Sequence, residues 1–189
     1  MASEAEAARA CLRPEDRLIV SGIGKVNAAA ATQRAILEGA TEVWNVGVAG
    51  GFDPAMQVGA CYAVDRAVEY DFDLAQVNGT AIGVHDERTT PYFTCATDGL
   101  DDLPRATLAT GDRFNDSEDD LATLAALGAT LRDMEGAAVA HVCERNDVPC
   151  CIVKCVSDVH GRGSMTGQYR DNLKTALASL SSKLKDLLK

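Results

Sequence analysis

The chain has 189 residues, a formal net charge of −10 and a pI near 4.7, and hydrophobic residues make up 47% of it. This length allows one domain with a sizeable core. The strong acidity argues against nucleic acid or an anionic membrane surface as a partner. No apolar run approaches the ~20 residues of a membrane span. Residues 2–10 lack the cationic, apolar pattern of a signal peptide, so we expect a cytoplasmic protein.

Helices and strands are expected to alternate along most of the chain. Ser3 and Glu6 have the spacing of a capping box, which predicts a first helix to about Leu12. The other expected elements are a strand over 17–24, a helix over 25–39, strands over 42–51, 59–71 and 105–111, a helix over 116–128 opened by acidic residues, a strand running into a helix over 130–147, a buried strand over 148–158 and an amphipathic closing helix over 167–189. Between 78 and 103 the periodicity fades, which is typical of a functional or mobile loop.

This order of elements predicts an α/β fold. We expect a single domain over residues 1–189, with a central, mixed but mainly parallel sheet flanked by helices. Ligands of open α/β sheets bind beyond the carboxyl ends of the strands. Five short segments fall at such ends: 22–24, 47–51, 111–114, 134–135 and 157–158. Their convergence predicts a small-molecule site.

Three acidic residues are candidates for chemistry, and each also has a plainer explanation. Asp158 directly follows an apolar strand, where burial would raise its pKa and make it a general acid, but it could equally cap a turn. Glu135 and Glu4 fit first-turn helix acids that interact with the helix dipole. Beside Met134, however, Glu135 would offer a sugar an apolar face and a bidentate acceptor for adjacent hydroxyls. The glycine turns likewise fit either tight turns or a close approach to a ligand.

The cysteines indicate a reducing compartment. Their number is odd, no C-x-x-C motif occurs, and two lie adjacent in an apolar strand, so we expect buried thiols. The seven are Cys11, Cys61, Cys95, Cys143, Cys150, Cys151 and Cys155. Since His141 and Cys143 are two residues apart on a predicted helix, they do not face one metal ion. We expect no metal and no organic cofactor.

Four segments together resemble a known enzyme family. They are "SGIGKVNAAAAT", "NVGVAGGFDPAMQVGACYAVD", "GDRFNDS" and "RDMEGAAVAHVCERNDVPCCIVKCVSDV". They occur in the order seen in methylthioadenosine/S-adenosylhomocysteine nucleosidases of the purine nucleoside phosphorylase superfamily, and the resemblance covers Met1 to Val159 plus the closing helix. It implies a nucleoside phosphorylase type of fold and hydrolysis of the N-glycosidic bond of a purine nucleoside. A 5′-thio-substituted adenosine is the first expected substrate, with a role in methionine salvage.

The resemblance also implies residue roles. Asp158 would protonate the leaving purine, and Glu4, in "MASEAE", would activate the attacking water. The implied substrate-binding residues are Met134, Glu135, Phe114, Ser157, Val48 and Asp133. Among them, Glu135 would bind the ribose hydroxyls. Cleavage through an oxocarbenium-like state needs a proton for the leaving base, a carboxylate near the sugar and a positioned water, which these acids could supply.

The sequence departs from the family pattern at several positions. Val48 replaces a usual Ser or Thr, Lys154 a common Arg, and Gly136 a usual Ala or Ser. The strand that precedes Glu4 in the family is missing or shortened. Two alternatives therefore stay open. A phosphate-dependent phosphorylase is disfavoured because no arginine pair stands at the glycine turns. A catalytically weak nucleoside-binding homologue is favoured by Val48 and the short N-terminal region.

We also expect a homodimer. In this superfamily a neighbouring subunit often contributes an apolar residue to the pocket, and the matching loop here contains "TTPYF" with Tyr92 and Phe93. Large aromatic side chains are costly to leave in water, and two-fold dimers are the commonest closed symmetry. The hypothesis is that Tyr92 or Phe93 caps the pocket of the partner. The alternative is that the chain folds both aromatics onto its own sheet.

Overall fold

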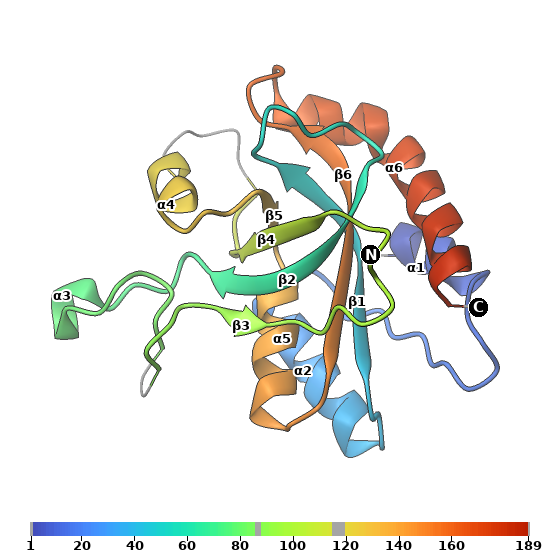
Figure 1. Ribbon diagram of the computed structural model, residues 1–189, viewed down its shortest axis with the longest axis horizontal. Coiled ribbons are helices and arrows are strands. Elements are labelled where there is room, and N and C mark those ends of the chain that lie inside the picture. The colour runs from blue at the N-terminus through green and yellow to red at the C-terminus, as the bar shows by residue number, and fades with distance from the viewer. Residues whose placement is uncertain (1, 86–87, 115–119, 189) are drawn as a thin grey trace.

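A computed structural model describes residues 2–85, 88–114 and 120–188, and its core is one mixed sheet (Figure 1). The strand order is β3-β2-β4-β5-β1-β6, and a further pairing of β2 with β6 closes the sheet into a barrel-like ring. The strands are β1 (Val43–Gly51), β2 (Cys61–Glu69), β3 (Phe93–Thr94), β4 (Arg105–Thr110), β5 (Leu131–Asp133) and β6 (Cys150–Val159). The longest pairings, β1–β6 and β2–β4, are parallel, whereas β2–β6 and β1–β5 are antiparallel. The predicted α/β class with a mixed sheet is confirmed.

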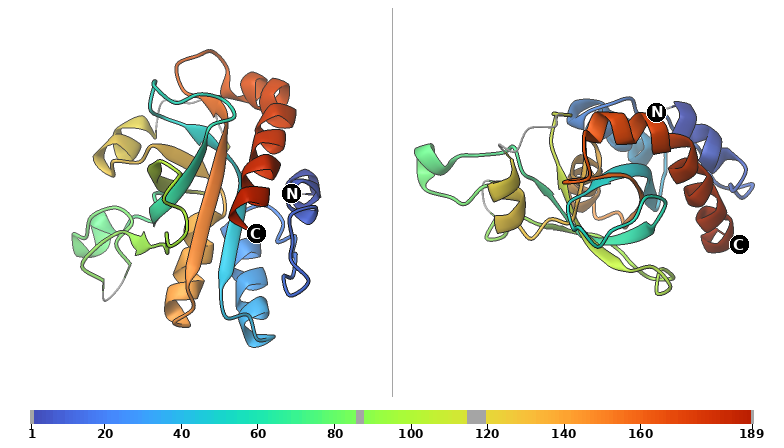
Figure 2. Two further views of the ribbon diagram at one scale, coloured as in Figure 1. Left: turned by 45° about the vertical axis from the view of Figure 1, so that its right-hand side comes forward. Right: turned by 90° about the horizontal axis from the view of Figure 1, so that it is seen from above.

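Helices cover the sheet on two sides (Figure 2). They are α1 (Ala2–Arg9), α2 (Lys25–Leu37), α3 (Ala75–Asn78), α4 (Leu121–Ala126), α5 (Gly136–Arg145) and α6 (Met165–Leu187). Helices α6 and α1 pack together on one side, and α2 packs on α5 on the other. Leu180 and Leu184 of α6 are buried against Val153 and Cys155 of β6. The N-terminus of α6 is fixed by Ser164, whose hydroxyl accepts a hydrogen bond from the N–H of Gly167 at 3.2 Å.

Two expectations for the N-terminal region are wrong. Helix α1 already includes Ala2, so Ser3 lies within the helix and does not cap it. Residues 17–24 form no strand, and Ile19 and Val20 are 41% and 53% exposed. A strand needs a hydrogen-bonded neighbour, and no strand of the described chain pairs with this segment. Its apolar composition alone was therefore insufficient to make it a strand.

The helix expected over 116–128 can be compared with the structure only from residue 120 onward. Helix α4 spans Leu121–Ala126, with Asp120 at its N-cap position. The acidic residues expected to open it, at 116, 118 and 119, lie outside the described residues. Hence only the second half of this prediction can be compared with the structure.

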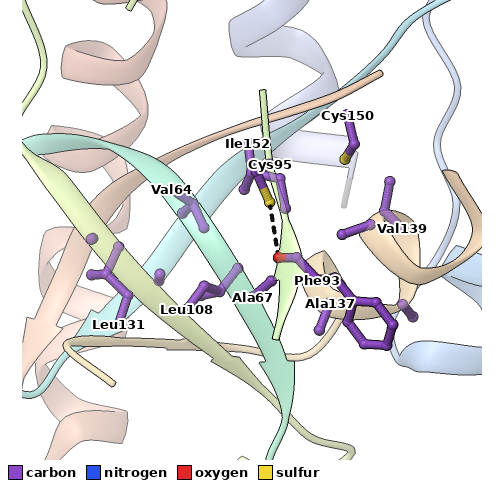
Figure 3. Packing of buried hydrophobic residues seen from close by; sticks show 14 of the residues in the cluster. Val64, Ala67, Phe93, Cys95, Leu108, Leu131, Ala137, Val139, Cys150 and Ile152 are labelled. Carbon is purple, nitrogen blue, oxygen red and sulfur yellow. Dashed lines mark hydrogen bonds between the residues drawn. The ribbon is translucent and has the colours of Figure 1, made fainter. Parts of the chain in front are cut away.

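The two aromatics proposed as a dimer contact differ in burial. Phe93 is fully buried, and its ring lies beside α5 near Ala137 and Val139 (Figure 3). The prediction that Phe93 caps a partner's pocket is wrong, because the chain buries this ring in its own core. Tyr92 is partly buried, and its hydroxyl donates to the carbonyl of Leu127 at 2.9 Å. A contact between Tyr92 and a partner stays a prediction.

The cysteines agree with the sequence interpretation. All seven are free thiols, of which six are buried and Cys61 is partly buried. Burial raises the pKa of the Cys151 thiol to about 12, so this group stays protonated near neutral pH. Among the described helices, none has the length and apolar character needed to cross a membrane.

Candidate active site

The site is built on the pairing of β1 with β6, where glycines allow two acids to approach the backbone closely. Gly47 pairs with Lys154, and Gly50 pairs with Asp158. A Cβ on Gly47 would lie 2.6 Å from Oε1 of Glu4, and one on Gly50 would lie 2.8 Å from Oδ2 of Asp158. Any larger residue would displace the carboxylates. This explains the glycines of β1 as positions of close approach.

Asp158 is held in place by a bulge and a hydroxyl. The register shifts between Ala49 and Gly50, so that Ser157 is an extra residue of β6. Bulges commonly change the direction of side chains next to active sites. The hydroxyl of Ser157 donates to Oδ1 of Asp158 at 2.6 Å, and Asp158 is only 1% exposed. Ser157, expected among the substrate-binding residues, thus orients the Asp158 carboxylate in this structure.

Glu135 occupies the N-cap position of α5 and faces the glycine turn before α2. Its Oε1 accepts a hydrogen bond from the N–H of Gly24 at 2.9 Å. Gly24 has a φ of +94°, a conformation that favours glycine. Burial, and next the nearby charge of Asp133, raise the pKa of Glu135, while Lys154 and the Gly24 N–H oppose this shift. Met134 lies half-buried directly before it, so the predicted Met-Glu pair is positioned together.

A buried ion pair between Lys154 and Asp133 lies next to Glu135 and interacts with its charge. Nζ of Lys154 lies 2.9 Å from Oδ2 of Asp133, which also accepts from the N–H of Gly136, while the hydroxyl of Thr110 donates to Oδ1. Burial acts to lower the pKa of Lys154, but Asp133 and then Glu135 outweigh it, so its pKa is raised. The Asp133 side chain is 2% exposed. The expectation that Asp133 binds substrate directly is therefore wrong, because its carboxylate is already enclosed and committed to protein groups.

Glu4 reaches the same region from α1. Its Oε1 accepts a hydrogen bond from the N–H of Val48 at 3.1 Å. The Val48 side chain packs with the core cluster beneath α6. Val48 thus contributes its backbone to the site by orienting Glu4, and its predicted substrate contact through the side chain is not supported by this packing.

Tyr169 is a site residue that the sequence did not reveal. Burial raises the pKa of its phenol, and the negative charges of Glu4, Asp158 and Glu135 raise it further, which places Tyr169 within electrostatic range of all three acids. Its ring meets Phe114 edge-on, with centroids 5.6 Å apart. Phe114 itself is 49% exposed, as suits a ring that stacks on a ligand. The only indication of Tyr169 in the sequence is that it is an aromatic residue among mostly polar residues at the start of α6.

A cavity of about 580 Å³ adjoins this cluster. Glu4, Glu135 and Lys154 line it, and residues 17–22 form part of the wall facing β1. The volume is within the usual range for small-molecule sites. Asp158 and Phe114 lie outside its lining, so the cavity covers the Glu4–Glu135 side of the site.

The fold and this arrangement of acids define a class of protein. Residues 17–189 match the family model described as the phosphorylase superfamily. The structure of a 5′-methylthioadenosine/S-adenosylhomocysteine nucleosidase from Borrelia burgdorferi, bound to adenine, has a TM-score of 0.87 at 22% identity and covers 100% of this chain and 96% of that one. A futalosine hydrolase from Helicobacter pylori has a TM-score of 0.81 at 24% identity, covering 89% and 76%. These structural likenesses establish the fold.

Sequence similarity narrows the assignment. The 5′-methylthioadenosine/S-adenosylhomocysteine nucleosidase of Marinomonas sp. (strain MWYL1) is 34% identical over 185 residues, covering 91% of this chain and 80% of the relative. That of Arabidopsis thaliana is 30% identical over 182 residues, covering 92% and 69%. The chain belongs to the 5′-methylthioadenosine/S-adenosylhomocysteine nucleosidase family of the phosphorylase superfamily, and the predicted resemblance is confirmed. It is an enzyme of the nucleosidase class.

Proposed function

We propose that this protein hydrolyses the N-glycosidic bond of a purine nucleoside, with a 5′-thio-substituted adenosine as the preferred substrate. The observation that carries the proposal is the grouping of Glu4, Glu135 and Asp158 around Tyr169 and the β1–β6 glycines. Each acid comes from a different element. Each also accepts a hydrogen bond from a backbone N–H or a hydroxyl group on one oxygen, which orients the carboxylate.

The geometry supports a division of labour along the nucleoside. Asp158 lies at the end of β6 and the ring of Phe114 is exposed, whereas Glu135 lines the cavity beside Glu4. We place the base near Asp158 and Phe114 and the ribose near Glu135. Asp158 would then donate a proton to the departing purine. Burial raises the pKa of Glu135, and Lys154 and the Gly24 N–H oppose this shift; in its charged form Glu135 would bind the ribose hydroxyls and stabilise the cationic sugar.

Glu4 completes the mechanism as the residue that activates water. Its contact with the Val48 N–H orients the carboxylate, which would accept a proton from water attacking the anomeric carbon. The proton balance closes, because the proton given by Asp158 leaves with the base and Glu4 receives one from the water. No cofactor is needed for these steps.

The charges around the cavity favour hydrolysis over phosphorolysis. Phosphate recognition generally uses available cationic groups. The basic residues that line the cavity are Arg13, Arg17 and Lys154, and within the described chain each is ion-paired, with Asp16, Glu38 and Asp133 respectively. A phosphate ion would have to displace a carboxylate from one of them.

The preference for a 5′-thio adenosine is supported by the names of the relatives at 30–34% identity. The test is a comparison of kcat/KM for methylthioadenosine, adenosylhomocysteine, adenosine, inosine and futalosine, measured by release of the base. Methylthioadenosine and adenosylhomocysteine should be cleaved best. Preferred cleavage of inosine or futalosine would overturn the substrate assignment while leaving the reaction class in place. Tight binding without any cleavage would instead identify a nucleoside-binding homologue.

We further propose that the enzyme acts in the cytoplasm. The support is chemical, since seven free thiols suit a reducing compartment. Fractionation of the source cells, followed by immunodetection, tests this proposal. Enrichment outside the cytoplasmic fraction would contradict it.

A further inference from the structure

Three side chains outside the catalytic cluster converge from separate parts of the fold. Glu69 ends β2, His85 lies between α3 and β3, and His141 is on α5. One ligand atom from each lies within 4.8 Å of the other two. We propose that Glu69, His85 and His141 form a binding site for a zinc ion, with water completing the coordination.

The distances fit this ion. Nδ1 of His141 lies 3.0 Å, and Nε2 of His85 lies 3.7 Å, from Oε1 of Glu69. Zinc–nitrogen and zinc–oxygen bonds of about 2.0–2.2 Å place tetrahedral ligands about 3.3–3.6 Å apart. The two observed distances bracket that range. Two imidazoles and one carboxylate, with water in the fourth position, are a known tetrahedral zinc set.

One nitrogen of this cluster lacks a hydrogen-bond partner within the described chain, which supports a bound ion. Nε2 of His85 is buried and has no hydrogen-bond partner among the described residues. Leaving such a nitrogen unsatisfied costs free energy, and a bound cation would satisfy it. The side chains of His85 and His141 are 16% and 26% exposed, so solvent and an ion can reach them.

Aromatic rings hold the imidazoles in position. Phe72 stacks on His85 with centroids 3.9 Å apart, and Phe93 stacks on His141 at 4.4 Å. The two imidazoles meet edge-on at 4.7 Å. Walls of this kind restrict ring motion and lower the local dielectric constant, which favours a preformed metal site.

The surrounding charges accept an added cation. Nζ of Lys25 lies 3.1 Å from Oε2 of Glu69, so it orients this carboxylate by its other oxygen. Lys25 also pairs with Asp71 at 2.6 Å, and Arg88 pairs with Glu144. Lys25 is therefore shared between Glu69 and Asp71, and Oε1 of Glu69 faces the two imidazoles.

The site would join three segments and lie close to the catalytic cluster. Lys25 follows Gly24, whose N–H binds Glu135. An ion at Glu69 would tie the end of β2 and the segment carrying His85 to α5, which Glu135 caps. Because it binds only the folded chain, zinc should raise the melting temperature.

The test uses untagged, metal-free protein titrated with zinc chloride in a calorimeter, and with cobalt(II) as a spectroscopic probe. One ion should bind per chain, and the melting temperature should rise. Loss of a hydrogen-bond partner of a metal ligand already costs about 10–100-fold in affinity. His85→Asn and His141→Asn should therefore weaken binding by at least ~10-fold. His160→Asn is the matched control, since this third histidine stacks on Phe52 outside the cluster.

The cobalt spectrum of the wild-type protein keeps the proposal testable even if a variant fails to fold. Ligation by nitrogen and oxygen gives visible bands without the near-ultraviolet charge-transfer band of cobalt–thiolate bonds. A thiolate band would assign the metal to the cysteines and overturn the proposal. Absence of saturable binding, or affinity unchanged in both His85→Asn and His141→Asn, would do so as well.

Discussion

Asp158 combines near-complete burial with one hydroxyl donor on Oδ1, the environment of a proton donor to a leaving base. Asp158→Asn keeps the shape and the Ser157 contact but cannot donate this proton. Turnover should fall by ~10²–10⁴-fold, with KM little changed. Asp101→Asn is the control, since the Asp101 side chain is 91% exposed and has no part in the proposed mechanism. Near-normal turnover in Asp158→Asn would remove this residue from the mechanism.

The charged form of Glu135 is expected to serve ribose binding but to lower the stability of the folded protein. Because its pKa in the folded protein is raised above the ordinary value of 4.5, folding favours the protonated form. The stability this group contributes is complete below 4.5 and is lost as pH rises through the raised folded pKa. Glu135→Gln, uncharged throughout, should therefore melt higher than the wild type at neutral pH, on the order of 2 °C.

The pH dependence separates this cause from a general packing effect. The difference in melting temperature between Glu135→Gln and the wild type should shrink as pH falls toward 4.5. Activity on ribosides should drop far more than activity on 2′-deoxyribosides. If the difference in melting temperature does not change with pH, the charge of Glu135 is not what lowers the stability of the wild type.

Helix α1 and strand β1 must approach closely for Glu4 to reach the site, and Gly47 permits this. In Gly47→Ala the new Cβ would lie 2.6 Å from Oε1 of Glu4, so the carboxylate must move. Hydrolysis should fall by ~10²-fold, because small displacements of catalytic groups are costly. Glu4→Gln should abolish hydrolysis and keep nucleoside binding.

Gly167→Ala provides the control for the glycine test. A Cβ on Gly167 meets its nearest atom at 3.7 Å, which is ordinary contact, so activity should be kept. If Gly47→Ala hydrolyses nucleosides as fast as Gly167→Ala does, the position of Glu4 is not critical.

At the level of elements, prediction from sequence worked where local pattern and tertiary pairing agreed. Strand β6 was found within two residues because its apolar run is buried along its whole length. Residues 17–24 have a similar local pattern, yet no strand among the described residues pairs with them. Pairing is a non-local property, and local propensity cannot supply it.

Within the site, motif residues were easier to predict than their roles. Glu135 and Asp158, at two of the predicted strand ends, lie near Tyr169 together with Glu4, which the family resemblance and not the strand-end argument had indicated. Asp133 shares the same motif as Glu135 but is enclosed by Lys154, which only the packing reveals. The convergence of Glu69, His85 and His141 joins residues 72 positions apart in the chain and left no spacing signal.

For the whole molecule, a homodimer stays a prediction. Phe93 is excluded as the contact, but Val77 on α3 is 81% exposed, and α3 stands well away from the sheet (Figure 1). We predict that a second copy contacts this projecting segment, since two-fold dimers are the commonest closed assembly. Light scattering at micromolar concentration should give a dimer, and Val77→Asp should shift it toward monomer. A monomeric wild type would contradict this prediction.

The central claim is that water, and not phosphate, attacks the sugar of a purine nucleoside held by Glu4, Glu135 and Asp158. The most direct measurement is mass spectrometry of the products from methylthioadenosine, with the wild-type enzyme in phosphate-free buffer and again with added phosphate. We predict adenine and the free methylthio-sugar at the same rate in both buffers. A sugar phosphate formed only when phosphate is present, or no cleavage in either buffer, would contradict the claim.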